Sequence, residues 1–214
     1  FCYNSFMRKY NIAPDLNKKY IRSVWNTLPK YIRPTLLLPS NTLSKQFDCD
    51  LTIATETFQF TGSFKFRPAY NLISSISHKN VIAGSSGNFG QAVAYTCKLL
   101  DKTCTVVMPD TTAKVKIDSV RSYGAKVDLI NIRKISRIDR VKELLKKYPE
   151  SFEAKAFDDY RVVAGNSTLG KEIFSYMDFD IIVVPIGGGG LSSGIIISRD
   201  FLNKKTQIIG VEPM

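Results

Sequence analysis

Segments rich in apolar and β-branched residues alternate with helix-like segments along this chain from about residue 50 onward. The strand-like segments cover residues 81–84, 103–109, 126–130, 180–185 and 206–211. The helix-like segments cover residues 88–100, 114–123, 136–148, 165–177 and 191–203. Strands that alternate with helices of this length pair in parallel, and such folds bind ligands beyond the carboxyl ends of their strands. The sequence therefore predicts an α/β fold with parallel sheets, in which residues 180–185 form a fully buried strand.

The composition is that of a globular chain with a sizeable core, since 44% of its 214 residues are hydrophobic. The apolar runs are too short to span a membrane, and the start of the chain does not resemble a signal peptide. His78 is the only histidine, which argues against a Ser-His-Asp mechanism. The four cysteines lack the spacing of a zinc site and predict reduced thiols in a cytoplasmic protein.

The net charge of +11 raises the question of a nucleic-acid or membrane partner. Residues 111–148 carry eleven Lys and Arg against four Asp and Glu, and residues 1–33 carry seven against one. Neither stretch interleaves its basic residues with an aromatic platform of the kind that single-strand binders use. We therefore interpret the excess as a solvated basic face and expect no membrane or nucleic-acid partner, with RNA or acidic lipid as the alternative.

Residues 59–67 place a lysine in surroundings that suit reaction with a carbonyl group. Lys65 follows a Thr-Gly-Ser turn and has Phe64 and Phe66 on either side. Partly dry surroundings disfavour the ammonium form, and the free amine is the form that condenses with carbonyls. Taken alone, a solvated lysine after a turn explains the same residues.

Two further segments are rich in glycine and lie where a strand-like segment meets a helix-like one. Residues 85–91 read Ser-Ser-Gly-Asn-Phe-Gly-Gln, and residues 187–190 are four consecutive glycines. Consecutive glycines let backbone N–H groups approach a phosphate, and the following helix N-terminus attracts the same anion. A flexible turn is the alternative, and a phosphorylated sugar or nucleotide would meet the same physical requirements.

In this order and spacing, the three segments resemble the fold-type II pyridoxal-phosphate enzymes, in the branch of threonine and serine dehydratases and serine racemase, with cysteine synthase more distant. The resemblance covers residues 34–214 and implies a two-domain, three-layer parallel-sheet fold of the tryptophan synthase β-like kind. It implies a large cofactor-binding domain made of residues 1–78 and 158–214, with an N-terminal arm over residues 1–40. Residues 79–157 would form a small inserted α/β domain.

The resemblance implies pyridoxal 5′-phosphate as the cofactor, joined to Lys65 as a Schiff base, with Phe64 packing on it. The phosphate would be held by the four consecutive glycines, Gly187, Gly188, Gly189 and Gly190. Asn88 would bind the 3-hydroxyl of the pyridine ring, although an ordinary helix N-cap explains this residue equally well. The substrate would be held at a helix N-terminus by the loop residues Ser85, Ser86, Gly87, Asn88 and Phe89.

Ser86 bears on which reaction the resemblance implies. Lys65 would act as base on one face of the substrate Cα, and Ser86 would protonate the opposite face in a racemase. Binding of the substrate carboxylate alone is the other interpretation of Ser86. The implied function is a dehydratase (ammonia-lyase), a racemase, or both, acting on a β-hydroxy amino acid such as L-serine or L-threonine. A cysteine-synthase-like β-replacement enzyme and a catalytically silent cofactor-binding homologue are the alternatives.

Several residues depart from the pattern of the family at positions that bear on substrate choice more than on cofactor binding. They are Ala54, Pro68, Phe89, Asn166 and Ser167, where the family usually has lysine, glycine, histidine (or Thr or Ala), glutamine and glycine. Phe89 would narrow or dry the substrate loop.

Members of the family continue well past the Glu-Pro pair near the end of this chain. Their additional segment supplies the last sheet strands and the residue that faces the pyridine nitrogen. We therefore expect a fragment of a longer protein, or a shortened homologue, that forms a homodimer or is completed by a second chain.

Glu212 matches the first of the carboxylates that hold a divalent or monovalent cation in several relatives. An exposed glutamate at a strand end is the alternative for Glu212.

Overall fold

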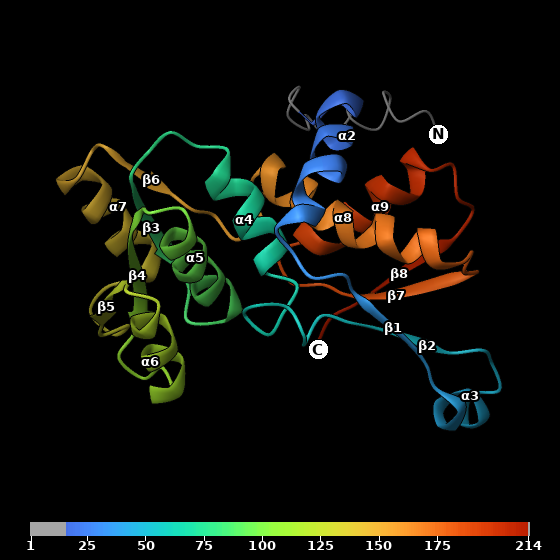
Figure 1. Cartoon of the computed structure of the whole chain (residues 1–214). Helices are drawn as coiled ribbons and strands as arrows, with labels where there is room; N and C mark the ends of the chain where they lie inside the picture. The colour runs from blue at the N-terminus through green and yellow to red at the C-terminus, as the bar shows by residue number, and fades with distance from the viewer. Residues whose placement is uncertain (1–15, 214) are drawn as a thin grey trace.

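The computed structural model of the chain describes residues 16–213. Its helices are α2 (Lys18–Thr27), the short 3₁₀ helix η1 (Leu28–Lys30), α3 (Asn41–Phe47), α4 (Phe66–Ser74), α5 (Asn88–Leu99), α6 (Lys114–Ser122), α7 (Arg137–Lys147), α8 (Tyr160–Tyr176) and α9 (Gly190–Phe201). Its strands are β1 (Leu36–Pro39), β2 (Thr52–Thr55), β3 (Asn80–Gly84), β4 (Thr103–Pro109), β5 (Lys126–Ile130), β6 (Ser151–Glu153), β7 (Ile181–Pro185) and β8 (Gln207–Val211). Figure 1 shows two lobes with α4 between them.

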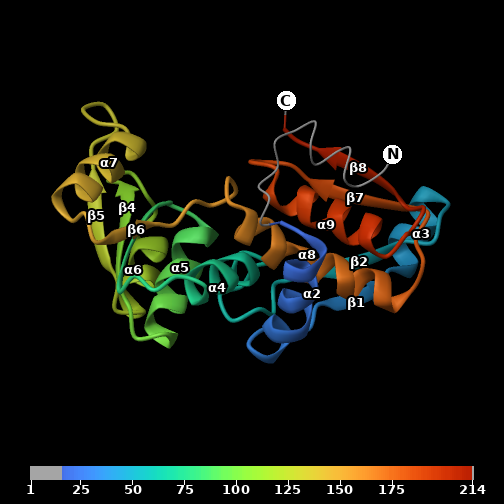
Figure 2. The ribbon, with the colours of Figure 1, turned by 90° about the horizontal axis from the view of Figure 1, so that it is seen from above.

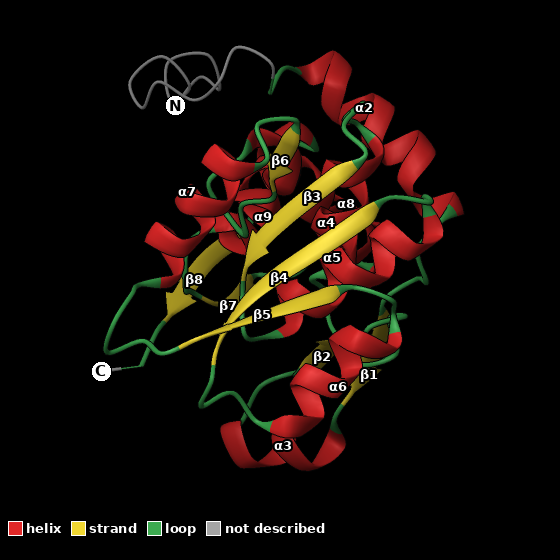
Figure 3. Cartoon of the chain, turned by 90° about the vertical axis from the view of Figure 1, so that its left-hand side faces the viewer, coloured by secondary structure: helices red, strands yellow, loops and turns green. Residues whose placement is uncertain are grey.

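One lobe is built on a parallel four-stranded sheet in the order β5-β4-β3-β6. Alternate strand residues face opposite sides, so Val81 and Val106 join a core with α5 and α6, whereas Ile82 and Val107 join a core with α7. Figure 3 shows β3, β4 and β5 side by side between these helices. Since both faces of the sheet are covered, its central strands are the near-continuous apolar runs that the sequence displays.

The other lobe contains the parallel pair β7–β8 and the antiparallel pair β1–β2. The apolar side chains of α8 and α9 pack against one face of β7 and β8, and Figure 2 shows the two helices beside these strands. Helix α2 packs on α8 through Ile21 and Trp25, and the Trp25 indole N–H donates to Ser167 Oγ at 2.8 Å. Helix α4 contributes apolar side chains to the cores of both lobes.

The parallel α/β architecture predicted from the alternating pattern is confirmed, and residues 103–109 and 126–130 form strands with the predicted bounds. Helix α8 starts at Tyr160, five residues before the predicted start, because Asp159 caps it by accepting a hydrogen bond from the Arg161 amide at 2.8 Å. Strands β1, β2 and β6, helices α2, α3 and α4 and the 3₁₀ helix η1 were not predicted. Each is short or lies outside the regular alternation.

The prediction that residues 180–185 form a fully buried strand is wrong. Strand β7 starts at Ile181, and its outer face exposes 51% of Ile181 and 63% of Val183. An apolar run marks a strand, but it does not distinguish a strand covered on both faces from one covered on a single face.

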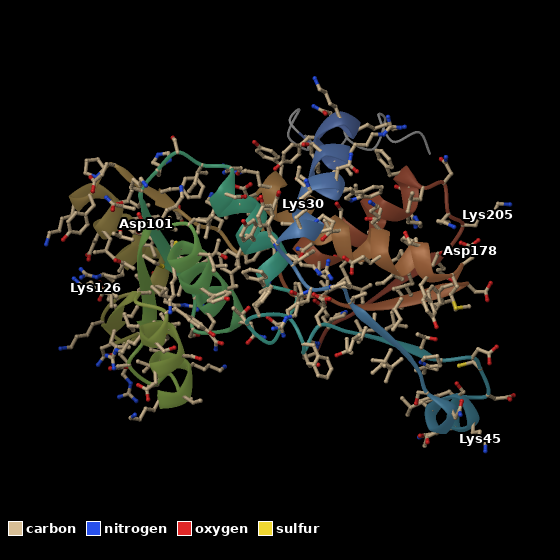
Figure 4. All side chains as sticks on the ribbon, in the orientation of Figure 1. Lys30, Lys45, Asp101, Lys126, Asp178 and Lys205 are labelled. Carbon is tan, nitrogen blue, oxygen red and sulfur yellow. The ribbon has the colours of Figure 1, made fainter. Side chains whose placement is uncertain are left out.

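The basic stretch 111–148 lies on α6, β5 and α7 of one lobe, and Figure 4 shows Lys126 at the outer edge of that lobe. The basic N-terminal stretch falls partly outside the described residues. Across residues 16–213, no helix combines the length and the hydropathy of a membrane-spanning segment. The boundaries of the large domain and its insert stay predictions.

Candidate active site

Lys65 sits at the entry to α4, directly after a tight turn. Gly62 has a φ of +71°, a conformation that favours glycine, and its amide donates to Gln59 O at 2.8 Å. The Lys65 amide lies 3.4 Å from Ser63 Oγ, and Phe66 begins the helix. The turn and the helix start thus fix the backbone of Lys65 between two ordered elements.

The Lys65 amine is half-buried among aromatic rings. Its Nζ lies 4.9 Å from the centre of the Phe64 ring and 5.9 Å from that of Phe89, and no hydrogen-bond acceptor or carboxylate partner for Nζ occurs among the described residues. Burial without an anionic partner lowers the pKa of the Lys65 amine from its ordinary value. The amine is therefore available in its nucleophilic form at a lower pH than a solvated lysine.

We expect Lys65 to react with an acylating reagent at lower pH than an ordinary lysine, whose pKa is about 10.4. Competitive labelling of the folded protein over a pH series, followed by mass spectrometry of the Lys65 peptide, measures this directly. The same peptide labelled in denaturant is the control. A labelling midpoint at the same pH in the folded and the denatured protein, or at a higher pH in the folded one, would contradict the expected lowering of the Lys65 pKa.

The loop 85–91 links the carboxyl end of β3 to the start of α5. Ser85 Oγ accepts the Gly90 amide at 3.1 Å, and a Cβ on Gly90 would lie 2.6 Å from Ser85 O, so the loop closes tightly on itself. The N-cap interpretation of Asn88 is wrong, because the capping position is Gly87 and makes no side-chain bond. The exposed Asn88 side chain, on the first residue of α5, is thus not used as a cap.

Ser86 and Phe89 lie on this loop in different surroundings. The Arg137 guanidinium, at the start of α7, lies 3.4 Å from Ser86 Oγ, which accepts from it. Phe89 is 3% exposed and belongs to the core beneath α5, and the centre of its ring lies 5.9 Å from the Lys65 amine. Phe89 therefore places the loop 85–91 near Lys65.

The four glycines form the turn between β7 and α9. Gly189 has a φ of +80°, and α9 begins at Gly190 without a side-chain cap. The amides of Gly187, Gly188 and Gly189 have no acceptor among residues 16–213. We refer to Gly187–Gly190 as the glycine turn. Free amides at an uncapped helix N-terminus suit a phosphate, so the residues present fit the phosphate group of the cofactor.

Phe157 is a neighbour of the glycine turn that the sequence did not reveal. A Cβ on Gly188 would lie 2.2 Å from Cγ of the Phe157 ring, whereas a Cβ on Gly187 would have nothing within 4 Å. Gly188 is thus required for packing against Phe157, whereas Gly187 has open space around it and, unlike Gly189, no positive φ. An aromatic residue in a connecting segment gives no sequence signal for this contact.

The structure brings the loop 85–91 close to Lys65 and links the lysine segment to the start of α9 through a shared apolar cluster. Phe89 brings the loop 85–91 to the amine, and Phe64 packs in the same apolar cluster as Leu191, the residue after the glycine turn. Glu212 is exposed, and the described residues hold no cluster of three His, Cys, Asp or Glu side chains around a metal position. The roles of all these residues, and the cation site at Glu212, stay predictions.

Residues 28–214 match the family described as pyridoxal-phosphate dependent enzymes. The chain is 33% identical to a serine racemase of Dictyostelium discoideum over 92% of its length and 62% of the relative. It is 36% identical to the catabolic L-threonine dehydratase TdcB of Staphylococcus aureus (strain USA300) over 87% of its length and 55% of the relative. The crystal structure of a pyridoxal 5′-phosphate-dependent aspartate racemase superposes with a TM-score of 0.85 at 32% identity, over 90% of this chain and 61% of that one.

The chain thus spans about three fifths of the length of these relatives. The family match covers residues 59–67, the loop 85–91 and the glycine turn, and the superposition agrees with the predicted fold type. This chain belongs to the family of pyridoxal-phosphate dependent enzymes.

Proposed function

We propose that this chain carries the catalytic lysine of a pyridoxal-phosphate-dependent lyase that dehydrates a β-hydroxy amino acid such as L-serine or L-threonine, with racemisation as a second activity. The observation that carries the proposal is the Lys65 amine, half-buried between Phe64 and Phe89 without an anionic partner among the described residues. The similarity to a serine racemase and an L-threonine dehydratase supports the substrate class.

In this proposal the cofactor, when bound, withdraws electrons from the substrate Cα and so makes its proton acidic. Lys65 attaches the cofactor and then removes that proton, for which a lysine of lowered pKa is suited. Loss of the β-hydroxyl as water leaves an enamine, and its hydrolysis by water gives a 2-oxo acid and ammonia. The exposed Asn88 side chain does not cap α5, so its amide is free to bind the ring hydroxyl of the cofactor.

Ser86 is the residue that would decide between dehydration alone and racemisation. Its Oγ accepts from the Arg137 guanidinium, so its own O–H remains available as a donor. A proton delivered by Ser86 to the face of Cα opposite Lys65 would invert the amino acid. Phe89, an apolar side chain, stands where the family usually has histidine (or Thr or Ala).

The proposal is tested by adding L-serine and L-threonine separately to the protein loaded with pyridoxal phosphate. We expect 2-oxo acid and ammonia in equal amounts, together with a change in the absorbance of the bound cofactor. A spectral change without either product would favour the cysteine-synthase-like alternative, and repetition with a sulfide nucleophile and an O-acetylated serine would identify it. A bound cofactor whose spectrum responds to none of these compounds would favour the silent binder.

Cofactor affinity should depend on the charge at Gly187. Gly187→Asp places a carboxylate beside the phosphate site in open space, whereas a change at Gly188 would also collide with Phe157. We expect the Asp variant to bind pyridoxal phosphate at least ~10-fold more weakly than Gly187→Asn, which has the same size without the charge, a difference of about 1.4 kcal/mol. Fluorescence titration measures both affinities. Equal affinities would mean that the phosphate binds elsewhere.

We also propose a cytoplasmic location and a homodimer, or a second chain that completes the fold. Three free thiols among the described residues, Cys49, Cys97 and Cys104, support a reducing compartment. The exposed apolar residues on the outer face of β7 and β8 support a covering polypeptide, since parallel strands are usually buried on both faces. Size-exclusion chromatography with light scattering tests the assembly state.

A further inference from the structure

Arg67, two residues beyond Lys65, is a fully buried guanidinium that uses all of its N–H groups. Nε and Nη2 donate to the two carboxylate oxygens of Glu56 at 2.7 and 2.8 Å. Nη1 and Nη2 donate to the two carboxylate oxygens of Glu172 at 2.8 and 2.9 Å. Nη1 also donates to Thr168 Oγ1 at 3.1 Å, and Nη2 lies 3.3 Å from Arg33 O. The Arg67 guanidinium thus forms two bidentate ion pairs, one with Glu56 and one with Glu172, and each is called a fork below.

The fork to Glu56 closes the base of the loop that carries Lys65. Glu56 follows β2, Arg67 lies in the first turn of α4, and the Thr-Gly-Ser turn with Lys65 lies between them. The Gln59 side chain is tied to the backbone of Arg33, since the Arg33 amide donates to Gln59 Oε1 at 3.2 Å and Gln59 Nε2 donates to Arg33 O. The loop is therefore held both at its base and along one side.

The fork to Glu172 fastens the same loop to α8. Glu172 and Thr168 are one turn apart on that helix, and a Cβ on Gly165 would lie 2.7 Å from Pro68 Cα and 2.9 Å from Arg67 O. Helices α4 and α8 thus cross in backbone contact. The Glu172 carboxylate is held in turn by the Thr35 amide at 2.7 Å.

Helix α8 is also in backbone contact with α9, which begins at the glycine turn. A Cβ on Gly194 of α9 would lie 2.7 Å from Asn166 Cβ and 2.8 Å from Ser167 N. A continuous path of close contacts therefore runs from Lys65 through Arg67 and α8 to the proposed phosphate site.

Stability alone explains this arrangement poorly, because buried ion pairs contribute little net stability over well-packed apolar residues. Two carboxylates face one guanidinium, and a lysine could not reproduce two planar forks. We propose that Arg67 is a positioning residue, which holds the Lys65 loop on α8 and so fixes the Lys65 amine relative to the glycine turn. This inference rests on the proposed function, in which Lys65 must reach a carbonyl group whose phosphate is held at that turn.

Arg67→Lys tests the inference, because it keeps a cation but loses both forks. The rate at which pyridoxal phosphate becomes fixed to Lys65, trapped with borohydride and mapped by mass spectrometry, should fall about 10- to 100-fold, as expected for a misplaced reacting group. Affinity for pyridoxine 5′-phosphate, which has the phosphate and the ring but no aldehyde, should stay within about 2-fold, because the glycine turn lies between β7 and α9 and does not contain Arg67.

Arg140→Lys is the matched control. Arg140 also bonds two carboxylates, Asp128 at 2.9 Å and Glu143 at 2.9 Å, but it lies on α7 in the other lobe. This variant should leave both measurements unchanged. If Arg67→Lys does not fold, Glu172→Gln replaces it; this variant keeps the size of the side chain, weakens one fork and should slow fixation at least ~3-fold.

An adduct rate within 2-fold of wild type in the folded Arg67→Lys protein, or in Glu172→Gln where that variant replaces it, would overturn the inference. An equal loss of adduct rate and pyridoxine-phosphate affinity would overturn it too, because the residue would then serve general stability. Failure of the proposed function looks different: the wild-type protein itself would give no adduct on Lys65.

Discussion

Replacement of Lys65 by alanine is expected to reduce formation of 2-oxo acid from L-serine or L-threonine by at least about 1000-fold. The variant loses the amine that attaches the cofactor and the base that removes the Cα proton, and loss of a positioned base alone costs about 100- to 10,000-fold. Lys65 is half-buried but makes no hydrogen bond from Nζ to a described residue, so the fold should tolerate the change.

The control for Lys65→Ala is Lys45→Ala. Lys45 lies in the last turn of α3, and Figure 4 shows it at the far end of the molecule from the lobe of β3–β6. Coupled assay of 2-oxo acid measures both variants. Turnover in the Lys65 variant above about a tenth of the wild-type rate would contradict the assignment of Lys65 as base.

Replacement of Ser86 by alanine should separate two activities. If Ser86 protonates Cα on the face opposite Lys65, racemisation of serine falls about 100-fold or more, the usual contribution of a positioned acid. Elimination from the L-enantiomer stays largely intact, because proton removal by Lys65 and departure of the β-hydroxyl require no acid on the far face. Chiral chromatography of serine and assay of the 2-oxo acid measure the two activities in one sample.

A parallel loss of both activities through a raised KM would mean that Ser86 only binds the substrate carboxylate. The protein would then be a dehydratase without a racemase function. The Arg137 guanidinium, which donates to Ser86 Oγ, is compatible with either role.

Apart from β6, the alternation of strands and helices could be predicted from residue 80 onward, because most elements there have a regular apolar period and end at a recognisable residue. Gly124, with a φ of +82°, ends α6, and Ser136 caps α7 through the Asp139 amide at 3.0 Å. The start of α8 was harder to predict. Its capping residue, Asp159, follows a second aspartate, and the apolar pattern becomes regular only a turn later.

Exposure could not be predicted from the same pattern. Ile181 and Val183 lie on a strand as apolar as β3, yet their face carries no helix within the described residues. Helix α2 shows the opposite case, because its sequence is strongly basic and yet one face of the helix is buried. Its apolar stripe packs on α8 and consists of Ile21, Val24 and Trp25. Whether a neighbour exists is a tertiary property that periodicity does not encode.

The candidate site could be found because its glycines and its lysine have local requirements that leave a signal in the sequence. Gly62 and Gly189 adopt positive φ at turns, and Lys65 lies directly after the first of them. Phe157 and Glu172 could not be found this way, because each acts across a distance of many residues on a partner in another element. Arg67 appears in the motif, but nothing in its neighbours indicates two forked ion pairs.

The central claim is that Lys65 holds pyridoxal phosphate, and borohydride reduction of the protein followed by peptide mapping tests it most directly. The protein is incubated with pyridoxal phosphate, reduced, digested and analysed by mass spectrometry, with Lys65→Ala treated in parallel. We expect stoichiometric label on the peptide that contains Lys65 and none on the variant. Label spread over other lysines, or the same labelling in both proteins, would contradict the account.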